Sequence, residues 1–299
     1  MQTNNSIFFK LFYSIAGLTL ASAMNTATAA DVAVEVKFAA VVNGEAFECG
    51  KSYPNIGTTT STITPSDFRF FVSEIHLIDA KGHATPVKLT QDKVWQLENL
   101  ALLDFENGSG PCKNGTKPTN TSVKGSIAAG DYKGLRFTLG VPFSMNHQDP
   151  TLAASPLSST ALFWTWQGGY KFLKFDTATS VQTATTSAPA ADGGGNSSGF
   201  SVHLGSTMCA ATSKTSPPTD CKNPNRLTVT FDKFDINKQI VTADIGAVLA
   251  KSNVDINAPG TSPGCMSFLK DADCPPVMSA LGLPYEGQAA GTQQFFTVK

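Results

Sequence analysis

The sequence consists largely of short segments in which apolar and polar residues alternate, and this pattern constrains the fold more than any other feature. Alternation of this kind is typical of a β-strand with one buried face. The segments are separated by turn residues and cover 32–38, 68–78, 134–139, 170–175, 200–204, 227–231 and 240–244. Because no amphipathic helix intervenes between most of them, they predict a mainly β fold, a single antiparallel sandwich or barrel-like domain, rather than an α/β sheet.

Helices are expected only as short insertions into this domain, at 157–166, 245–251 and 277–281. The stretch 183–198 is rich in Ala, Gly, Ser and Thr and cannot bury enough apolar surface to order itself, so we expect a mobile loop or crossover there. The strands on either side of it are short, which favours an excursion from one domain over a linker between two. We therefore expect one β domain over residues 30–299.

The N-terminus has the features of a cleaved signal peptide over residues 1–29. Lys10 supplies one positive charge, residues 11–23 form a mostly apolar run, and Ala27-Thr28-Ala29 gives the small residues that a signal peptidase accepts. We expect cleavage after Ala29 or Ala30. No later segment has the ~20 consecutive apolar residues of a membrane span, so the mature chain is expected to be soluble and periplasmic or secreted.

Six cysteines lie in the mature part of the chain, at 49, 112, 209, 221, 265 and 274. An even number of cysteines in an exported protein favours three disulfides. Six thiols allow about fifteen pairings, and proximity in sequence is the only guide to them. It favours Cys209 with Cys221 and Cys265 with Cys274, which leaves Cys49 with Cys112 by elimination.

Charge and motif content argue against several classes of function. The chain has 22 basic and 23 acidic side chains and no basic stripe, which disfavours a nucleic-acid partner. It has no G-x-S-x-G elbow, no H-E-x-x-H pair and no compact Ser/His/Asp grouping. We therefore expect that the protein is not an enzyme, although carboxylates assembled in space by the fold stay open as an alternative.

Two of the four histidines are candidate metal ligands. His83 lies in a turn and His76 in the middle of a strand, where solvated and half-exposed side chains are the simpler interpretation. His147 precedes the loop signature Gln148-Asp149-Pro150, and His203 ends a strand before Gly205. Each of these two, taken alone, is more often an ordinary loop histidine than a ligand.

Two of the three tryptophans, Trp164 and Trp166, lie just before a Gly-Gly break. They could pack in the core, or form with Tyr170 a platform that stacks on a sugar or a protein surface, which defines an alternative function as an exported carbohydrate- or surface-binding β-sandwich. An indole donates one hydrogen bond and has no lone pair suited to a metal. Unmodified tryptophans therefore cannot be ligands.

A set of motifs in a fixed order carries a family resemblance that covers about Phe68 to Cys274. The motifs are Leu102-Leu103-Asp104-Phe105, Gly140-Val141-Pro142-Phe143, Asn146-His147-x-Asp149-Pro150, Pro156-Leu157, Phe163-Trp164-x-Trp166, Gly169-Tyr170-Lys171-Phe172, His203-Leu204-Gly205-Ser206-Thr207 and the last four cysteines. Together they resemble the MbnP-type, methanobactin-associated periplasmic proteins, also described as four-Cys partners of a di-haem protein. Several separated motifs in one order are far more specific than a lone W-x-W.

This resemblance implies a periplasmic copper-binding protein with a role in copper homeostasis. It also implies that Trp164, the first tryptophan of the pair, is oxidised to kynurenine by an MbnH-type di-haem protein of the MauG and cytochrome c peroxidase group. Copper proteins of the CorA and MopE kind are more distantly similar and use a kynurenine with two histidines. On this sequence the implied ligands are His147, His203 and the oxidised Trp164.

The chemistry of the modification agrees with this implication. Opening the indole ring creates an aromatic amine whose nitrogen has an available lone pair, so oxidation would switch the site on. Two imidazoles and this amine suit copper, most simply Cu(I), and disfavour magnesium or calcium.

Four further residues receive secondary roles in this hypothesis. Met145 and Met208 are reserve ligands, because a thioether suits Cu(I), or they are simply packing residues. Asp149 either orients His147 or caps the next turn. Trp166 is either an electron relay toward a docked haem protein or a core residue.

Overall fold

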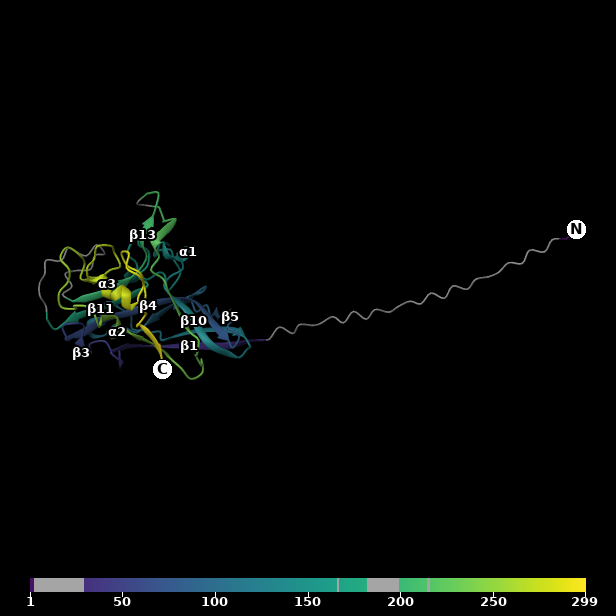
Figure 1. The fold of residues 1–299 in the computed structure, drawn as a ribbon, viewed down its shortest axis with the longest axis horizontal. Coiled ribbons are helices and arrows are strands. Elements are labelled where there is room, and N and C mark those ends of the chain that lie inside the picture. Colours follow the sequence, from purple (N-terminus) through teal and green to yellow (C-terminus); the bar gives the residue numbers. More distant parts are fainter. Residues whose placement is uncertain (3–29, 166, 182–198, 214–215) are drawn as a thin grey trace.

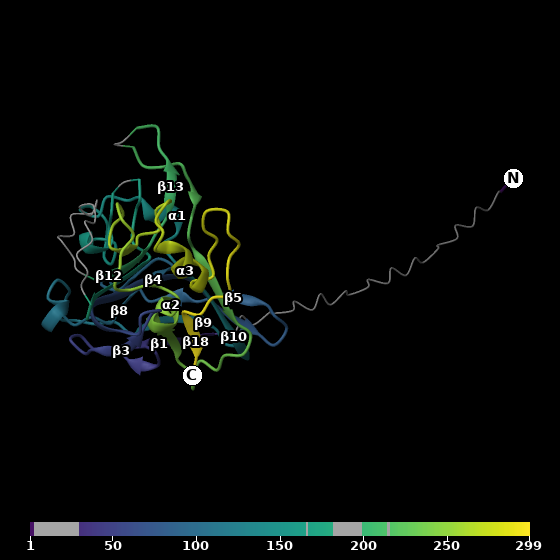
Figure 2. The ribbon, with the colours of Figure 1, turned by 60° about the vertical axis from the view of Figure 1, so that its left-hand side comes forward.

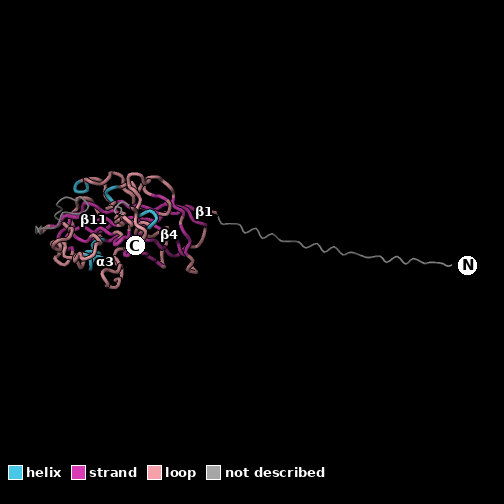
Figure 3. The backbone as a smooth tube through the Cα atoms, turned by 90° about the horizontal axis from the view of Figure 1, so that it is seen from above, coloured by secondary structure: helices cyan, strands magenta, loops and turns pink. Residues whose placement is uncertain are grey.

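The computed structural model describes residues 1–2, 30–165, 167–181, 199–213 and 216–299. Almost all of the predicted signal peptide, the predicted loop at 183–198 and Trp166 lie outside the described residues. Strands dominate, and the helices are short (Figure 3). Within the described residues, no helix is long and apolar enough to cross a membrane.

The elements follow one another in this order. They are β1 (Asp31–Val42), β2 (Glu45–Ala46), β3 (Tyr53–Ile56), β4 (Ser61–Asp79), β5 (Ala84–Pro86), β6 (Lys88–Leu89), β7 (Gln96–Leu97), β8 (Leu100–Asp104), the 3₁₀ turn η1 (Gly110–Cys112), β9 (Ser122–Ala128), β10 (Tyr132–Leu139), α1 (Phe143–Asn146), the 3₁₀ turn η2 (Thr160–Leu162), β11 (Leu173–Thr179), β12 (Phe200–Leu204), β13 (Thr207–Ala210), β14 (Asp220–Asn223), β15 (Leu227–Phe231), β16 (Val241–Asp244), α2 (Ile245–Leu249), β17 (Gly264–Cys265), α3 (Cys274–Ala280) and β18 (Phe296–Val298).

The long strand β4 is the axis of the larger sheet. Along one edge it pairs first with β11 and then with β10, which lie end to end, and along the other edge it pairs with β3, β8 and β5. β10 continues to β15, and β11 continues to β12 and β17. The middle of β4, residues 67–73, is buried on both faces, because one face meets the second sheet and the other lies under loops, among them the one after β10 that places Tyr170 on Phe71.

The second sheet has the order β18-β16-β1-β9-β6 and packs its apolar face on the larger one. Aromatic rings fill the space between the sheets: Phe38 of β1 meets Phe70 of β4 at 6.1 Å between ring centroids and Phe137 of β10 at 5.6 Å. Phe296 of β18 contacts the same two rings. The two layers and the C-terminal strand are visible in Figures 1 and 2.

The predicted sandwich is confirmed, and the barrel-like alternative is wrong because neither sheet closes on itself. Most strand pairs are antiparallel, as expected. Two pairs, β1 with β16 and β12 with β17, are parallel. In both, the partner strand returns after a long excursion of the chain, which is what parallel pairing requires.

Two of the three expected helices are present. α2 begins after Asp244, whose carboxylate accepts hydrogen bonds from the backbone N–H groups of Gly246 and Ala247, and α3 covers most of the third predicted piece. The helix expected at 157–166 is wrong, because its described residues, 157–165, contain only the single 3₁₀ turn η2. The expected strand at 170–175 begins later, at Leu173, because Tyr170 forms an isolated bridge with Phe163 instead.

All three predicted disulfides are confirmed. Cys49 is bonded to Cys112, Cys209 to Cys221 and Cys265 to Cys274. The first ties the segment after β2 to η1, the second joins β13 to β14, and the third joins β17 to α3.

The face of β4 that points away from the sandwich core carries buried charges. The Arg69 guanidinium forms ion pairs with Asp67 and, at 3.8 Å, with Glu106. Asp104 at the end of β8 lies beside them and is 2% exposed. Burial raises the pKa of Asp104 to about 8, with Arg69 opposing and the carboxylates of Glu106 and Asp67 adding to the rise.

Replacing Asp104 tests this assignment. Because its pKa in the folded protein lies above the ordinary 3.8, the group favours the folded state fully below about pH 4, and this contribution is lost as pH rises through about 8. Asp104→Asn cannot ionise, so we expect it to be more stable than the wild type at pH 8.5, on the order of 1–3 kcal/mol. The difference should shrink toward pH 4, as measured by urea unfolding.

The exposed residue Asp131 provides the control. Asp131→Asn should change stability by less than about 0.5 kcal/mol at either pH. A stability difference for Asp104→Asn that is the same at pH 8.5 and pH 4 would contradict a protonated Asp104.

Candidate metal centre

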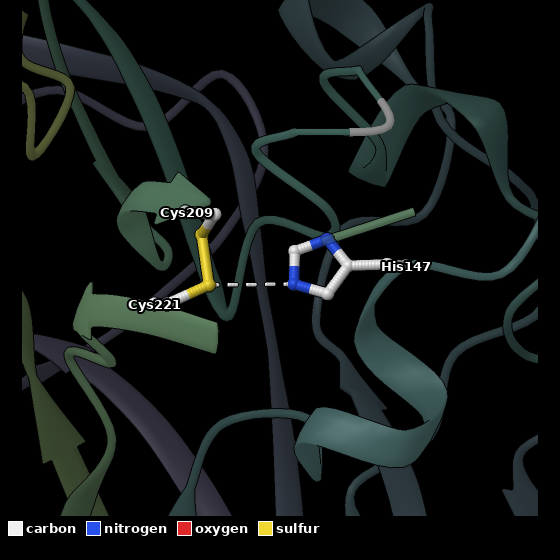
Figure 4. A group of neighbouring side chains, drawn as sticks. All are labelled: His147, Cys209 and Cys221. Carbon is white, nitrogen blue, oxygen red and sulfur yellow. Dashed lines mark hydrogen bonds between the residues drawn. A yellow bond between two sulfur atoms is a disulfide. The ribbon is translucent and has the colours of Figure 1, made fainter. Parts of the chain in front are cut away.

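His147 caps the C-terminal end of α1. The helix begins after Pro142, whose carbonyl oxygen accepts the N–H groups of Met145 and Asn146. The His147 side chain is 6% exposed. Its Nε2 atom lies 3.2 Å from the amide nitrogen of Asn146 and 3.5 Å from Sγ of Cys221, so the ring faces the Cys209–Cys221 disulfide (Figure 4).

Asn146 determines which nitrogen of His147 carries a lone pair. The side-chain oxygen of Asn146 accepts the backbone N–H of Tyr170 at 2.9 Å, which directs the amide NH₂ group toward His147. An NH₂ group donates, so Nε2 of His147 accepts and the ring proton of the neutral imidazole resides on Nδ1. The lone pair of the neutral ring is therefore on Nε2, and a metal ion bound there would displace the hydrogen bond from Asn146.

His203 lies on β12, and strand pairing places it beside β11. Its Nε2 atom is 2.7 Å from Oδ1 of Asp176, and Asp176 also receives a 2.7 Å ion pair from Lys174. Burial raises the pKa of Asp176, but the attraction of His203 and Lys174 outweighs it and holds the pKa well below the ordinary range. An ionised carboxylate accepts, so Nε2 carries the proton and Nδ1 of the neutral ring has the lone pair.

Trp164 lies in the tight turn that joins Phe163 to Tyr170, which form an isolated antiparallel bridge. Its backbone N–H donates to the carbonyl oxygen of Gly169 at 3.0 Å, and its indole is half-buried. The ring lies against Gly205, two residues after His203: a Cβ atom on Gly205 would be 2.4 Å from Cζ3 of the indole. Phe268 contacts the indole at 5.2 Å between ring centroids.

Asn146 also joins the three segments that carry the predicted ligands. Besides its bonds to His147 and Tyr170, its amide nitrogen lies 3.4 Å from the hydroxyl of Ser206. Gly169, at a φ of +71°, approaches so closely that a Cβ atom there would lie 2.4 Å from the Asn146 carbonyl oxygen. The segments of His147, Trp164 and His203 therefore meet in one region. The two imidazoles face different partners: His147 faces the disulfide, and His203 faces a carboxylate.

The structure separates the roles of the secondary candidates. Met145 is 3% exposed within the hydrophobic core, whereas Met208 on β13 is 48% exposed. The carboxylate of Asp149 accepts the backbone N–H and the hydroxyl of Thr151, which is the turn-capping alternative. Trp166 lies outside the described residues, so its two alternatives stay as predicted.

Tyr170 does not fit the alternative of a sugar-stacking platform. It is fully buried, and its hydroxyl donates to the carbonyl oxygen of Leu157. Its inclusion in an exposed aromatic surface was wrong, because the turn after Trp164 directs Tyr170 inward onto Phe71. The expectations for the other two histidines are confirmed: His76 is half-buried, and His83 is exposed and contacts Asp79.

Two residues of this region were missed by sequence reasoning. Asn146 belongs to a quoted motif but received no role, although its place directly before His147 was a usable signal. Asp176 gave no signal, since only the register of β11 against β12 brings it to His203.

Gly205→Ala tests the packing of the indole. The added methyl group cannot fit between Cζ3 of Trp164 and the Tyr170 carbonyl oxygen, which would lie 2.4 and 2.9 Å away. We expect a loss of about 1–3 kcal/mol of stability and a changed near-UV circular dichroism signal. Gly130→Ala is the control, because its Cβ atom would meet only the half-exposed Tyr132 ring at 3.1 Å. Equal effects of both substitutions would contradict the close packing of Trp164 on Gly205.

Comparison with known proteins agrees with the motif order. The family model described as MbnP matches residues 31–267. Among solved structures, the chain is similar to MbnP from Methylosinus trichosporium, with 31% sequence identity and a TM-score of 0.77 over 90% of this chain and 98% of that chain. No match was found among curated proteins. This chain therefore belongs to the MbnP family.

Proposed function

We propose that this chain is a periplasmic copper-binding protein whose site is completed when Trp164 is oxidised to kynurenine by an MbnH-type di-haem partner. Its role would lie in copper homeostasis, and in this proposal it is the substrate of the haem protein and not itself a catalyst. The convergence of the His147, Trp164 and His203 segments around Asn146 carries the proposal. Membership of the MbnP family supports it.

The donor set fits a soft ion with few ligands. In the neutral rings, the hydrogen bond from Asn146 places the lone pair of His147 on Nε2, where a metal ion would displace the amide, and the hydrogen bond to Asp176 places that of His203 on Nδ1. Neutral imidazoles bind copper well. The kynurenine amine of residue 164 would supply the third donor, and bound Cu(I) would supply a soft, low-coordinate centre.

The surroundings of Trp164 suit an oxidation carried out from outside the protein. The indole is half-buried, and its neighbour Phe268 is 45% exposed. An electron can leave such a ring for a haem protein docked on this surface. At the same time, the contacts with Gly205 and Phe268 hold the ring beside the strand of His203.

The central test uses the mature chain produced with its di-haem partner. We expect the peptide that contains Trp164 to lose one carbon atom and gain one oxygen atom, and the protein to retain one copper ion per chain against a chelator. Trp164→Phe should abolish the mass change and lower copper retention at least tenfold. Trp95→Phe is the matched control and should leave both unchanged, because Trp95 follows β6 and lies outside the converging segments.

An unmodified Trp164 together with undiminished copper affinity would contradict this proposal. Normal copper retention by the Trp164→Phe variant would do the same.

The two nearby aspartates should behave differently. Asp176→Asn removes the carboxylate that holds the proton on Nε2 of His203, so we expect copper affinity to fall roughly 10–100-fold, the usual effect of losing such a partner. The yield of kynurenine should be retained. Asp149→Asn, which affects only the turn at Thr151, should leave copper affinity within about twofold. Equal losses in both variants, measured by chelator competition, would argue against the role of Asp176.

A further inference from the structure

The ring of His147 faces a pair of sulfur atoms that the proposed function does not use. The ligand atoms of His147, Cys209 and Cys221 all lie within 4.8 Å of one another, and Sγ of Cys221 is 3.5 Å from Nε2. As Figure 4 shows, the imidazole points at the disulfide from the side opposite the hairpin that carries it. Among the described residues, these three form the one cluster of His, Cys, Asp and Glu side chains whose ligand atoms lie close enough together to hold a metal ion.

The disulfide lies on a part of the fold that can change without disturbing the core. β13 and β14 form a two-stranded sheet separate from the two large ones, with Cys209 directly opposite Cys221. Both ribbon views show this hairpin projecting from the body beside α1 (Figures 1 and 2). Cys209 is half-buried and Cys221 is 6% exposed, so an external thiol can attack the Cys209 side of the bond.

We propose that reduction of the Cys209–Cys221 disulfide converts this place into a second metal site, in which His147 and the two thiolates bind Cu(I). A protein dithiol of the thioredoxin class would supply two electrons and two protons. Its thiolate attacks one sulfur, the S–S bond breaks, and the dithiol ends as a disulfide while both cysteines become thiols. When Cu(I) binds, each thiol releases its proton to solvent, and the oxidation state of copper does not change.

The geometry of the three donors suits this ion. Ligands about 2.0–2.3 Å from a metal lie roughly 4 Å apart in a three-coordinate plane. The three ligand atoms now lie within 4.8 Å of one another, and the two sulfur atoms, bonded to each other in the disulfide, would separate to this spacing after reduction. Nε2 of His147 carries the lone pair of the neutral ring and already faces the sulfur atoms, and a metal ion bound there would displace the hydrogen bond from Asn146. Two thiolates and one imidazole form a soft, low-coordinate set that favours Cu(I).

His147 belongs to both sites, so the two cannot be filled by it at once. Cu(I) bound by the two thiolates would hold His147 in its present orientation toward the sulfur atoms and so withdraw it from a site with His203 and residue 164. This exchange rests on the proposed function, whereas the thiolate site itself does not.

The test uses the full mature chain carrying Trp164→Phe, which removes the kynurenine site and so separates the two proposals. The protein is treated with dithiothreitol, freed of it without oxygen, and loaded with Cu(I) against a chromogenic Cu(I) chelator. We expect one additional Cu(I) per chain that appears only after reduction, with a near-ultraviolet thiolate-to-copper absorption. Alkylation and peptide mapping should find Cys209 and Cys221 reactive before copper is added and protected afterwards.

Three variants in the same background complete the test. His147→Gln should lower the affinity of the reduced protein for Cu(I) at least tenfold, and the double variant Cys209→Ser with Cys221→Ser should lose the reduction-dependent binding. The matched control, Cys265→Ser with Cys274→Ser, removes a disulfide of similar sequence separation and should retain it; if this control does not fold, the alkylation map alone decides.

Two results would overturn the proposal. One is the appearance of free thiols at Cys209 and Cys221 without added Cu(I) retention. The other is a disulfide that stays intact at every dithiothreitol concentration at which the protein keeps its native circular dichroism spectrum.

Discussion

The burial of the middle of β4 on both faces is the constraint on which the rest of this structure depends. One face places Phe68 and Phe70 in the core between the sheets. The other carries Arg69, which contacts Glu106 in the loop after β8, and Phe71, which contacts Tyr170 in the loop after β10. Because β11 pairs with the first part of β4 and β10 with the second, the loop between these strands, which holds His147 and Trp164, must pass over the second face. The candidate metal centre is thus a consequence of how one long strand is shared between two partners.

Two hydrogen-bonding side chains fix the histidines of the candidate centre. Asn146 donates to Nε2 of His147, which places the lone pair of the neutral ring there, and Asp176 accepts from Nε2 of His203, which places it on Nδ1. Asn146 also bonds the turn after Trp164 and contacts the segment after β12. A single amide therefore fixes both the tautomer of His147 and the proximity of the three segments, which links the local hydrogen bonding to the proposed copper chemistry.

His147 stands at a junction between two possible donor sets. The segment that carries His147 adjoins the segments of His203 and Trp164. The ring of His147 faces the disulfide between β13 and β14. In the two proposals each set becomes complete only after a covalent change, oxidation of an indole in one and reduction of a disulfide in the other. Because these changes run in opposite redox directions, the proposals assign the same imidazole to different copper states under oxidising and reducing conditions.

The sequence by itself indicated the strand-rich class and the pairing of the cysteines, because alternation is a local signal and two of the three disulfides join cysteines close in sequence, which left the third pair by elimination. It also predicted the helix that begins at residue 245. It also identified the family through the order of separated motifs. Only the tertiary structure decided that 157–166 is a turn and not a helix, that Tyr170 is buried, and that Asp176 and the Cys209–Cys221 disulfide are the neighbours of His203 and His147. These contacts arise from strand register and from the path of a loop over the sheet, and both depend on the burial of distant segments against each other rather than on any pattern along the chain.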